Sequence, residues 1–276
     1  MSARAVRGRD GAAALDVDCA YGSATLHLQG AHLVSWIPAG GEERLFVSEA
    51  ARFGPGESIR GGVPICFPQF AELGPLPMHG FAHVVPWEWS GHTETGVVLT
   101  LRDSDATRSV WPHRFTAQYA VDLAPSTLHL AFSVRNDDAA PLLWSGTLHT
   151  FCAMDARQAR IRGLGPAWFV DRGHGGRLTE DPDDVLRVPG YTDRVYLDAG
   201  PEVHVDDGRG RLVIAQTGFR DTVVWNPGPE TSRRFPDLAP DEHERFVCIE
   251  AAEVRPVEIA PQGAWQGSQT LKIVGD

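Results

Sequence analysis

The sequence lacks a long apolar run, because none of its stretches approaches the ~20 residues that a membrane-spanning helix needs. The N-terminal segment MSARAVRGRDGAA carries arginines without an apolar stretch behind them, so it does not have the pattern of a secretory signal. We expect residues 1–13 to form a flexible tail. Basic residues are also scarce, with 25 Lys and Arg against 36 Asp and Glu and a formal net charge of −11. This balance argues against a nucleic-acid or an anionic-membrane partner.

Cysteines and the short motifs of common enzyme classes are equally few. The four cysteines (Cys19, Cys66, Cys152 and Cys248) lie far apart among apolar residues and form no CxxC pair. Buried free thiols in a reducing compartment are the interpretation we adopt, which predicts a cytoplasmic protein. The sequence contains no HExxH, GxSxG or Walker motif, and no GxGxxG follows an expected strand. These absences give no support to a metal site or a nucleotide cofactor.

Helical periodicity is absent too, since no segment of about twelve residues or more repeats its apolar residues at the helical period. Apolar residues instead alternate in short runs bounded by Gly, Pro, Asp or Asn, which is typical of an antiparallel sandwich or barrel. We therefore predict an all-β protein with few short helices, forming one domain over residues 1–276. The expected strands are Ala24–Gly30, His32–Ile37, Val97–Leu101, Phe115–Leu123, Thr127–Arg135, Leu142–Met154, Arg211–Gln216, Thr222–Trp225, Phe246–Ala252 and Thr270–Val274.

One segment, Ser58–His83 (SIRGGVPICFPQFAELGPLPMHGFAH), holds four glycines and four prolines, which exclude a helix through its middle. It carries Arg60 at one end and His79 and His83 at the other. Such a loop is either a connection whose charges face water or one wall of a binding site. The two histidines are four residues apart, but Gly80 makes a helical metal-binding pair improbable.

His149 lies in the expected strand PLLWSGTLHTFCAMD. Alternation places it on one face with Ser145, Thr147 and Phe151, pointing away from Trp144. Two interpretations stay open from this position. His149 is either a hydrogen-bonded structural histidine or an acid–base group held on a rigid strand.

Glu250 shares its strand face with Phe246, Cys248 and Ala252, so a carboxylate projects into an apolar row. Burial should raise its pKa unless a cation or hydrogen-bond donors compensate. A buried charge requires a partner or a catalytic role, so Glu250 is either part of a structural salt bridge or a functional group.

The other acidic residues give weaker signals. Glu253 falls on the opposite strand face and Glu258 follows a turn, so we expect both to be solvated. Asp193 and Asp221 begin short alternating runs, where acidic residues usually cap turns. Asp193 and Glu250 together would also suit the paired carboxylates of a glycosidase.

The motifs together resemble the aldose 1-epimerase superfamily, in particular its D-hexose-6-phosphate mutarotase (glucose-6-phosphate 1-epimerase) branch. The resemblance spans nearly the whole chain and rests on these segments in order: LQGAHLVSWIPAG, LFVSEAARFGPGESIRGGVPICFPQF, LPMHGFAHVVPWEW, TRSVWPHRF, LHTFCAMD, TDRVY, DTVVWNPG, VCIEAAEV and GAWQGSQTL. It implies a large antiparallel β-sandwich of the galactose mutarotase type, with the sugar bound on the concave face of one sheet. It also implies an isomerase that interconverts α and β anomers of a hexose 6-phosphate without a cofactor.

The resemblance also assigns roles to particular residues. It implies that His149 of LHTF protonates the ring oxygen and that Glu250 of CIEAA removes the proton of the anomeric hydroxyl. His79 of HGFA and Asp193 of TDRVY would hold sugar hydroxyls, and Arg60 of IRGG would bind the phosphate. Gln69 and His83 complete the expected substrate-binding set. The residue types also suit this chemistry, because a histidine and a carboxylate of raised pKa can exchange protons near neutral pH.

His83 departs from the family pattern, which usually reads HGFAR and uses that arginine to grip the 6-phosphate. A neutral imidazole cannot replace a bidentate guanidinium, and the loss of one charge-assisted contact costs roughly 1.5–3 kcal/mol. Arg52 is one cation that could compensate.

Three hypotheses follow from the sequence. The first is a mutarotase for a hexose 6-phosphate, or for an unphosphorylated or other hexose, acting as a monomer on a small sugar. The second is a sugar-binding protein that keeps the sandwich without turnover. The third is a glycoside hydrolase that uses Asp193 and Glu250, which requires a suitable separation of the two carboxylates.

Overall fold

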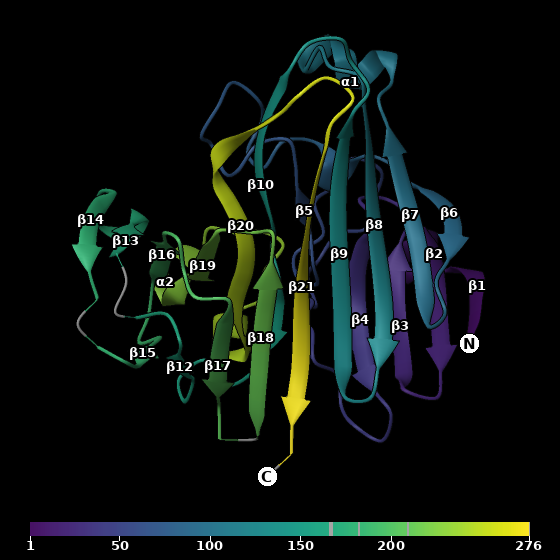
Figure 1. Ribbon diagram of the computed structural model, residues 1–276. Helices are drawn as coiled ribbons and strands as arrows, with labels where there is room; N and C mark the ends of the chain where they lie inside the picture. Colours follow the sequence, from purple (N-terminus) through teal and green to yellow (C-terminus); the bar gives the residue numbers. More distant parts are fainter. Residues whose placement is uncertain (166–167, 182, 209, 276) are drawn as a thin grey trace.

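The alternating runs form strands in a computed structural model that describes residues 1–165, 168–181, 183–208 and 210–275. Within these residues the strands pair antiparallel in three sheets (Figure 1). The four-stranded sheet has the order β1 (Ser2–Arg7), β2 (Ala13–Cys19), β3 (Gly22–His27) and β4 (His32–Pro38). The eight-stranded sheet has the order β14 (Arg177–Glu180), β13 (Trp168–Asp171), β16 (Thr192–Tyr196), β19 (Asp221–Asn226), β20 (Phe246–Ile259), β10 (Leu142–Leu148) and β5 (Ile65–Cys66), with β11 (Phe151–Ala153) also paired to β20.

The nine-stranded sheet has the order β15 (Leu186–Arg187), β12 (Arg160–Arg162), β17 (Glu202–Asp206), β18 (Arg211–Thr217), β21 (Ala264–Val274), β9 (Thr127–Asn136), β8 (Phe115–Ala124), β7 (Gly96–Arg102) and β6 (Glu88–His92). Helices are short: α1 (Asp105–Val110), α2 (Gly228–Ser232) and the 3-10 turns η1 (Arg9–Gly11), η2 (Ala82–Val84), η3 (Arg172–His174) and η4 (Glu242–Arg245). Among the described residues, no helix has the length and apolar character needed to cross a membrane.

Each expected strand has a counterpart, but two expectations are corrected. The stretch predicted as one strand, Leu142–Met154, is two strands, β10 and β11, because the chain leaves the ladder at His149 and Thr150. The N-terminal tail is also not free: β1 pairs with β2 from Ser2 opposite Asp18 to Arg7 opposite Ala13. Backbone hydrogen bonds to the open edge of β2 hold this arginine-bearing strand in place, which its side-chain pattern does not indicate.

The main core lies on one face of the eight-stranded sheet, between it and the other two sheets. Ile249 and Ala251 of β20 belong to this core, together with Val224 of β19. Thr150 donates a hydrogen bond to Gln269 of the nine-stranded sheet (2.5 Å), and Gln269 donates to the Ile249 carbonyl (3.0 Å). Because successive strand residues point to opposite faces, Glu250 faces away from this core. The second face of the eight-stranded sheet therefore remains available for a site.

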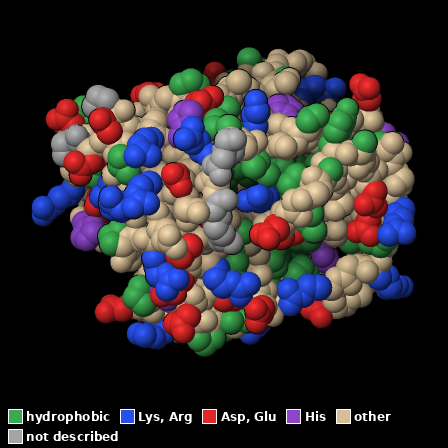
Figure 2. Space-filling view, turned by 90° about the horizontal axis from the view of Figure 1, so that it is seen from below, with side chains coloured by type: hydrophobic (Ala, Val, Ile, Leu, Met, Phe, Trp, Pro, Cys, Tyr) green, Lys and Arg blue, Asp and Glu red, His purple; other side chains and the backbone are tan. Residues whose placement is uncertain are grey.

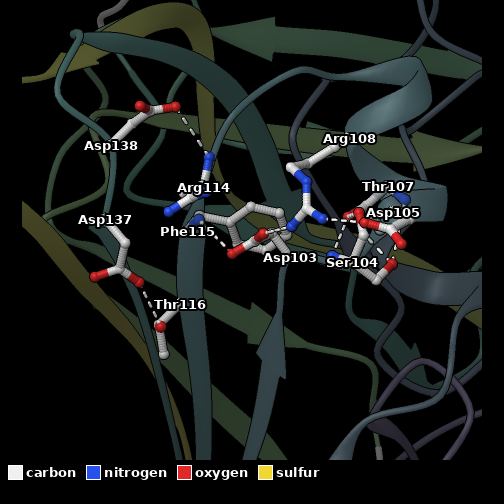
Figure 3. Close-up of polar contacts among 10 residues, drawn as sticks. All are labelled: Asp103, Ser104, Asp105, Thr107, Arg108, Arg114, Phe115, Thr116, Asp137 and Asp138. Carbon is white, nitrogen blue, oxygen red and sulfur yellow. Dashed lines mark hydrogen bonds and ion pairs between the residues drawn. The ribbon is translucent and has the colours of Figure 1, made fainter.

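The connection from β7 to β8 carries α1, whose six residues are too few to be stable alone. Its N-terminus is capped reciprocally by Ser104 and Thr107 (Figure 3). Arg108 pairs with Asp103 and Asp105, and Asp103 accepts a hydrogen bond from the Phe115 backbone N–H. These contacts fix α1 against the start of β8. The helix lies at the top of the molecule in Figure 1.

The surface seen from below carries acidic and basic side chains side by side (Figure 2). The described side chains of this face form no continuous basic surface of the kind that nucleic acids bind.

Trp144 provides a test of the core. Its side chain is 1% exposed, and its ring centroid lies 4.6 Å from that of Trp265 and 5.7 Å from that of Phe67. We expect Trp144→Ala to lower the free energy of unfolding by about 3–5 kcal/mol, because it removes buried apolar surface and leaves a cavity. Leu143→Ala, at the 56% exposed neighbour, should change it by about 0.5 kcal/mol or less. Urea denaturation measures both, and equal losses would contradict this account of the core.

Candidate active site

The loop between Ser58 and His83 lies along the edge of β10 that faces away from β20, and its residues Ile65–Cys66 form β5 there. Backbone N–H groups of Ser145 and His149 donate to the carbonyls of Pro68 and Pro64, both at 3.0 Å, and that of Phe151 donates to Gly62 (2.9 Å). The loop thus satisfies the edge of the sheet although its prolines prevent a regular ladder. Of the two alternatives left open by the sequence, these bonds argue against a connection that lies free in solvent.

Two glycines and a buried histidine fix the loop beside Arg60. Gly61 has a φ of 122°, and a Cβ there would lie 2.3 Å from the carbonyl oxygen of Phe46. The ring Nε2 of His32 donates to the Gly61 carbonyl (2.7 Å), and burial lowers the pKa of His32 to about 3. His32 is therefore a neutral structural donor. It holds the backbone next to Arg60 in one position.

The second face of the eight-stranded sheet carries a cavity of about 420 Å³. Its walls combine cationic, acidic, imidazole and aromatic side chains on the loop, the sheet and the turns around it. The lining residues are Ser58, Arg60, Phe70, Ala71, Glu72, Met78, His79, His83, His149, Arg172, Tyr191, Asp193, Val223, Trp225, Thr231, Phe235 and Glu250. The structure therefore brings together six of the seven residues expected from sequence: Arg60, His79, His83, His149, Asp193 and Glu250.

His149 and Glu250 meet at the floor of the cavity. The imidazole Nε2 lies 3.3 Å from the Glu250 carboxyl Oε1, and their side chains are 12% and 2% exposed. The His149 ring stacks on Phe151 with centroids 4.8 Å apart and meets the edge of Trp225 at 5.8 Å. Aromatic packing holds the imidazole in one orientation. The separation of Nε2 and Oε1 is just beyond the hydrogen-bond reach of about 3.2 Å, so a small approach of the two side chains brings them within range for proton exchange.

Burial shifts the two groups in opposite directions. It raises the pKa of Glu250 well above its ordinary value, and a hydrogen bond from Thr147 works against this rise. Burial also lowers the pKa of His149 well below its ordinary value, with further lowering by the charges of His79 and Arg60. Both shifts favour the uncharged pair, in which Glu250 holds the proton and His149 is neutral.

His79 and His83 form the wall opposite the sheet. His79 has a φ of 66°, and its Nδ1 accepts the backbone N–H of Ala71 (3.3 Å), so its Nε2 carries the proton when the ring is neutral. Burial lowers the pKa of His79 and of His83 to about 4 each. Neither ring is charged at neutral pH. Position 83, where the resemblance implies an arginine, therefore contributes no positive charge here.

The guanidinium of Arg60 stands over the Phe235 ring, 4.5 Å from its centroid. It pairs with Asp237 through two nitrogens, each 3.3 Å from a carboxylate oxygen. Asp237 was not singled out by sequence because 177 residues separate it from Arg60. The pairing fixes the guanidinium plane at the cavity wall.

Arg172, from η3, is a second cation in the cavity, and sequence reasoning missed it. Its Nη2 donates to both oxygens of Glu72 at 3.0 Å, and its Nε lies 3.4 Å from Asp193. Tyr191 also donates to Asp193 (3.3 Å). Burial raises the pKa of Asp193, and the Arg172 guanidinium opposes that rise. The only hint in the sequence is a charged Asp171–Arg172 pair directly after a short alternating run.

Several expectations for single residues are corrected by the structure. Gln69 does not line the cavity: its amide N–H groups donate to Ala71 (2.9 Å) and Leu76 (3.0 Å), and its oxygen accepts the Leu76 N–H (2.9 Å). Its side chain is committed to closing the loop. His149 lies in the break between β10 and β11 rather than within a strand. Arg52 is exposed and outside the lining, so it is not the compensating cation.

Glu253 is buried rather than solvated. It is 1% exposed and lies 2.6 Å from the Arg220 guanidinium, 33 residues away in the chain. The ion pair explains how the carboxylate is tolerated on the inner side of the strand. Glu258, in contrast, is exposed as expected.

The three histidines of the cavity do not form a metal centre with neighbouring carboxylates. Within the part of the chain that the structure describes, no group of three or more His, Cys, Asp or Glu is arranged to hold a metal ion. The cavity carboxyls have other neighbours: Glu250 contacts His149, and Asp193 contacts Arg172 and Tyr191.

A sequence model of the family described as aldose 1-epimerase matches residues 15–272. The chain belongs to the aldose 1-epimerase family. Relatives provisionally named glucose-6-phosphate 1-epimerase, from Cenchrus ciliaris and Salmonella typhimurium, are 32% and 36% identical over 267 and 246 residues. The alignments cover 91% and 85% of this chain and 81% of each relative. A crystal structure provisionally assigned as a mutarotase, YeaD from S. typhimurium, has a TM-score of 0.87 at 31% identity, covering 96% of this chain and 91% of that chain.

These similarities confirm the expected all-β fold of the galactose mutarotase type and the expected enzyme class. The chain is an isomerase, and its family relationship supports hexose mutarotation as the reaction. In the site described above, His149 and Glu250 lie together on the floor of a cavity.

The buried carboxyl of Glu250 gives a prediction about stability and pH. Its pKa is higher in the folded chain than the value of 4.5 it takes when unfolded. The stability that this group supports is therefore complete below about pH 4.5 and is lost as the pH rises through the folded pKa. The loss amounts to about 1.4 kcal/mol for each pH unit that separates the folded pKa from the unfolded one. We expect Glu250→Gln to raise the free energy of unfolding relative to wild type at about pH 8 and to approach wild type near pH 4.5.

Chemical denaturation across this pH range measures the difference. Glu258→Gln, an exposed position on the same strand, serves as the matched control and should follow wild type at every pH. A Glu250→Gln difference that stays constant with pH would contradict the raised pKa.

Proposed function

We propose that the chain interconverts the α and β anomers of a hexose 6-phosphate, with His149 and Glu250 as its acid and base. The observation that carries the proposal is the 3.3 Å contact between the His149 Nε2 and the Glu250 Oε1 on the floor of the cavity. The substrate class is taken from the relatives provisionally named glucose-6-phosphate 1-epimerase. A sugar would be held by His79 and Asp193 and would present its anomeric carbon to the pair.

Ring opening requires one proton to leave the anomeric hydroxyl and one to reach the ring oxygen. In this proposal Glu250 takes the first proton and His149 gives the second. The sugar opens to its aldehyde, rotates about the C1–C2 bond, and closes on the other face while the two groups exchange roles. The pair starts with an imidazolium and a carboxylate and ends with a neutral imidazole and a carboxylic acid. The number of protons on the enzyme is unchanged throughout, so no exchange with water is needed.

Burial of the pair favours the uncharged form, which is the form that accompanies the open sugar. The desolvation that raises the pKa of Glu250 and lowers the pKa of His149 thus favours the step from closed ring to aldehyde. The cost falls on the starting state, where the proton must first move from Glu250 to His149. The short Oε1 to Nε2 distance allows that transfer within the site.

A phosphate beside Arg60 would reduce this cost. The charge of Arg60 is one of the influences that lower the pKa of His149. A bound phosphate dianion offsets that charge and so favours the imidazolium that protonates the ring oxygen. Carbon 6 is bonded to C5, next to the ring oxygen, so a sugar with its ring oxygen at His149 directs its phosphate to the His149 side of the cavity. Arg60 lies in the same lining.

Exchange spectroscopy by NMR, or polarimetry, tests the proposal directly. Wild type should equilibrate the anomers of glucose 6-phosphate faster than buffer, and Glu250→Gln and His149→Asn should each lower the enzymatic rate by about 100-fold or more. Calorimetric binding of the sugar should persist in both variants, and Glu258→Gln should retain wild-type rates. Failure of wild type to exceed the buffer rate with phosphorylated and free hexoses alike would leave a sugar-binding protein. Release of an alcohol from a glycoside would indicate a hydrolase.

His83 gives a second test, which concerns recognition of the phosphate group and not the proton-transfer chemistry. Its ring is neutral at the position where related sequences usually carry arginine. We expect His83→Arg to raise the ratio of kcat/KM for glucose 6-phosphate to that for glucose by about tenfold or more, because it adds a charge-assisted contact. His83→Gln adds no charge and should leave the ratio near wild type. A ratio unaffected by the arginine would place the phosphate elsewhere in the cavity.

A further inference from the structure

The two oxygens of the Glu250 carboxyl have different neighbours. Oε1 lies 3.3 Å from the His149 Nε2, whereas Oε2 accepts a hydrogen bond from the Thr147 hydroxyl at 3.1 Å. Thr147 is 2% exposed and sits on β10, opposite Ala252 of β20. One oxygen therefore faces the catalytic partner, and the other is held from the interior of the sheet.

The Thr147 hydroxyl has one proton but two acceptors at nearly the same distance. The Glu250 Oε2 lies 3.1 Å away and the Ala251 carbonyl oxygen lies 3.0 Å away. An ionised carboxylate is the stronger acceptor, so the proton turns to Oε2 when Glu250 is charged. When Oε1 is protonated, Oε2 becomes a weaker acceptor, and the hydroxyl can turn to the Ala251 carbonyl. The buried donor is satisfied in both states, which avoids the cost of a stranded polar group.

We propose that Thr147 is a positioning residue that holds Glu250 with Oε1 toward His149 and stabilises its ionised form through a hydroxyl that changes acceptor as Glu250 gains or loses a proton. The proposal rests on the function proposed above, because it concerns the same carboxyl. It adds a residue to which neither the sequence motifs nor the family relationship assigns a role. The Thr147 hydrogen bond opposes the burial that raises the pKa of Glu250, in agreement with this role.

Other groups around Glu250 also affect its pKa. They act equally in wild type and in a variant of Thr147, so their effects cancel when the two pKa values are compared. Its charged and titratable neighbours come from several elements: His149 from the break after β10, Asp193 from β16, Arg172 from η3, Cys66 from β5 and Cys248 from β20. Burial raises the pKa of both thiols well above the ordinary value, so these two neighbours stay uncharged. A substitution of Thr147 that preserves volume changes the hydrogen bond and leaves these charges in place.

The test is the pH dependence of kcat/KM for glucose 6-phosphate in wild type, Thr147→Val and Thr147→Ser, with the spontaneous rate subtracted. The pair acts with one shared proton, and Glu250 holds that proton in the dominant form, so activity falls as the pH rises through the pKa of Glu250 and the proton is lost. Valine keeps the shape of threonine and removes the hydroxyl that stabilises the carboxylate, so the pKa of Glu250 rises and the basic limb should move upward by about one pH unit. Serine restores the hydroxyl and should return the limb to its wild-type position. Thr147→Ala is made in parallel, in case the valine variant does not fold. It also lacks the hydroxyl and should shift the limb in the same direction.

Thr222→Val is the matched control. Thr222 is buried on the adjacent β19, opposite Ala251, and its hydroxyl has no hydrogen-bond partner among the described residues. The same isosteric change there should leave the pH profile at its wild-type position. A shift in both variants would trace the effect to the sheet and not to the Thr147 hydroxyl.

A Thr147→Val profile that coincides with wild type, or that drops equally at every pH, would overturn the proposal and leave Thr147 a structural residue. Infrared titration of the carboxyl, taken as wild type minus Glu250→Gln, gives a readout that needs no turnover. If wild type fails to accelerate any hexose while the carboxyl titration still shifts in Thr147→Val, the proposed function fails and the role of Thr147 stands. If wild type is active and the carboxyl titration does not shift in Thr147→Val, the proposed function stands and the role of Thr147 fails.

Discussion

The pairing of β20 with both β10 and β11 is the constraint on which the site depends. Leu148 lies opposite Ala251 and Phe151 opposite Cys248, so β20 runs unbroken past the two residues that leave the ladder. The Ile249 N–H donates to the Thr150 carbonyl (3.1 Å) across this break, which keeps the two strands in one sheet. His149 is thereby held on the same side as Glu250. Two buried ionisable groups are tolerable there because each is the proton partner of the other.

The other wall of the site is built on the edge of β10 that faces away from β20. A regular strand along that edge would present alternating side chains and a flat surface, whereas the proline-rich loop pairs only at intervals. Between its hydrogen bonds the loop can turn side chains into the cavity. The same backbone contacts that satisfy the sheet therefore place Arg60 and His79 opposite Glu250. The same hydrogen bonds satisfy the backbone groups of β10 and hold the loop at the site, which explains how so irregular a segment is fixed in place.

Local features of the sequence were enough to predict strands such as β8, β9 and β20 and the face on which Glu250 lies, because period-two alternation is a property of neighbouring residues. Contacts between distant residues were not predictable in this way. Arg172 meets Asp193 across 21 residues, and Arg220 meets Glu253 across 33. Composition gave no reason to choose these partners, and so Glu253 was expected in solvent. Gln69 was misassigned for a related reason: the motif identifies the residue, but only the fold shows that its amide closes the loop.

In the proposed function, charge in the cavity links substrate binding to catalysis. Each guanidinium in the lining is paired with carboxylate, Arg60 with Asp237 and Arg172 with Glu72 and Asp193. An incoming phosphate must therefore share Arg60 with Asp237, which lowers affinity below that of an unpaired arginine. The compensation lies in the chemistry, since the same phosphate relieves the repulsion by Arg60 that adds to burial in keeping His149 neutral. Part of the binding energy of the phosphate then favours the protonated form of His149 and does not appear as affinity. Binding of a remote group can accelerate a reaction in this way.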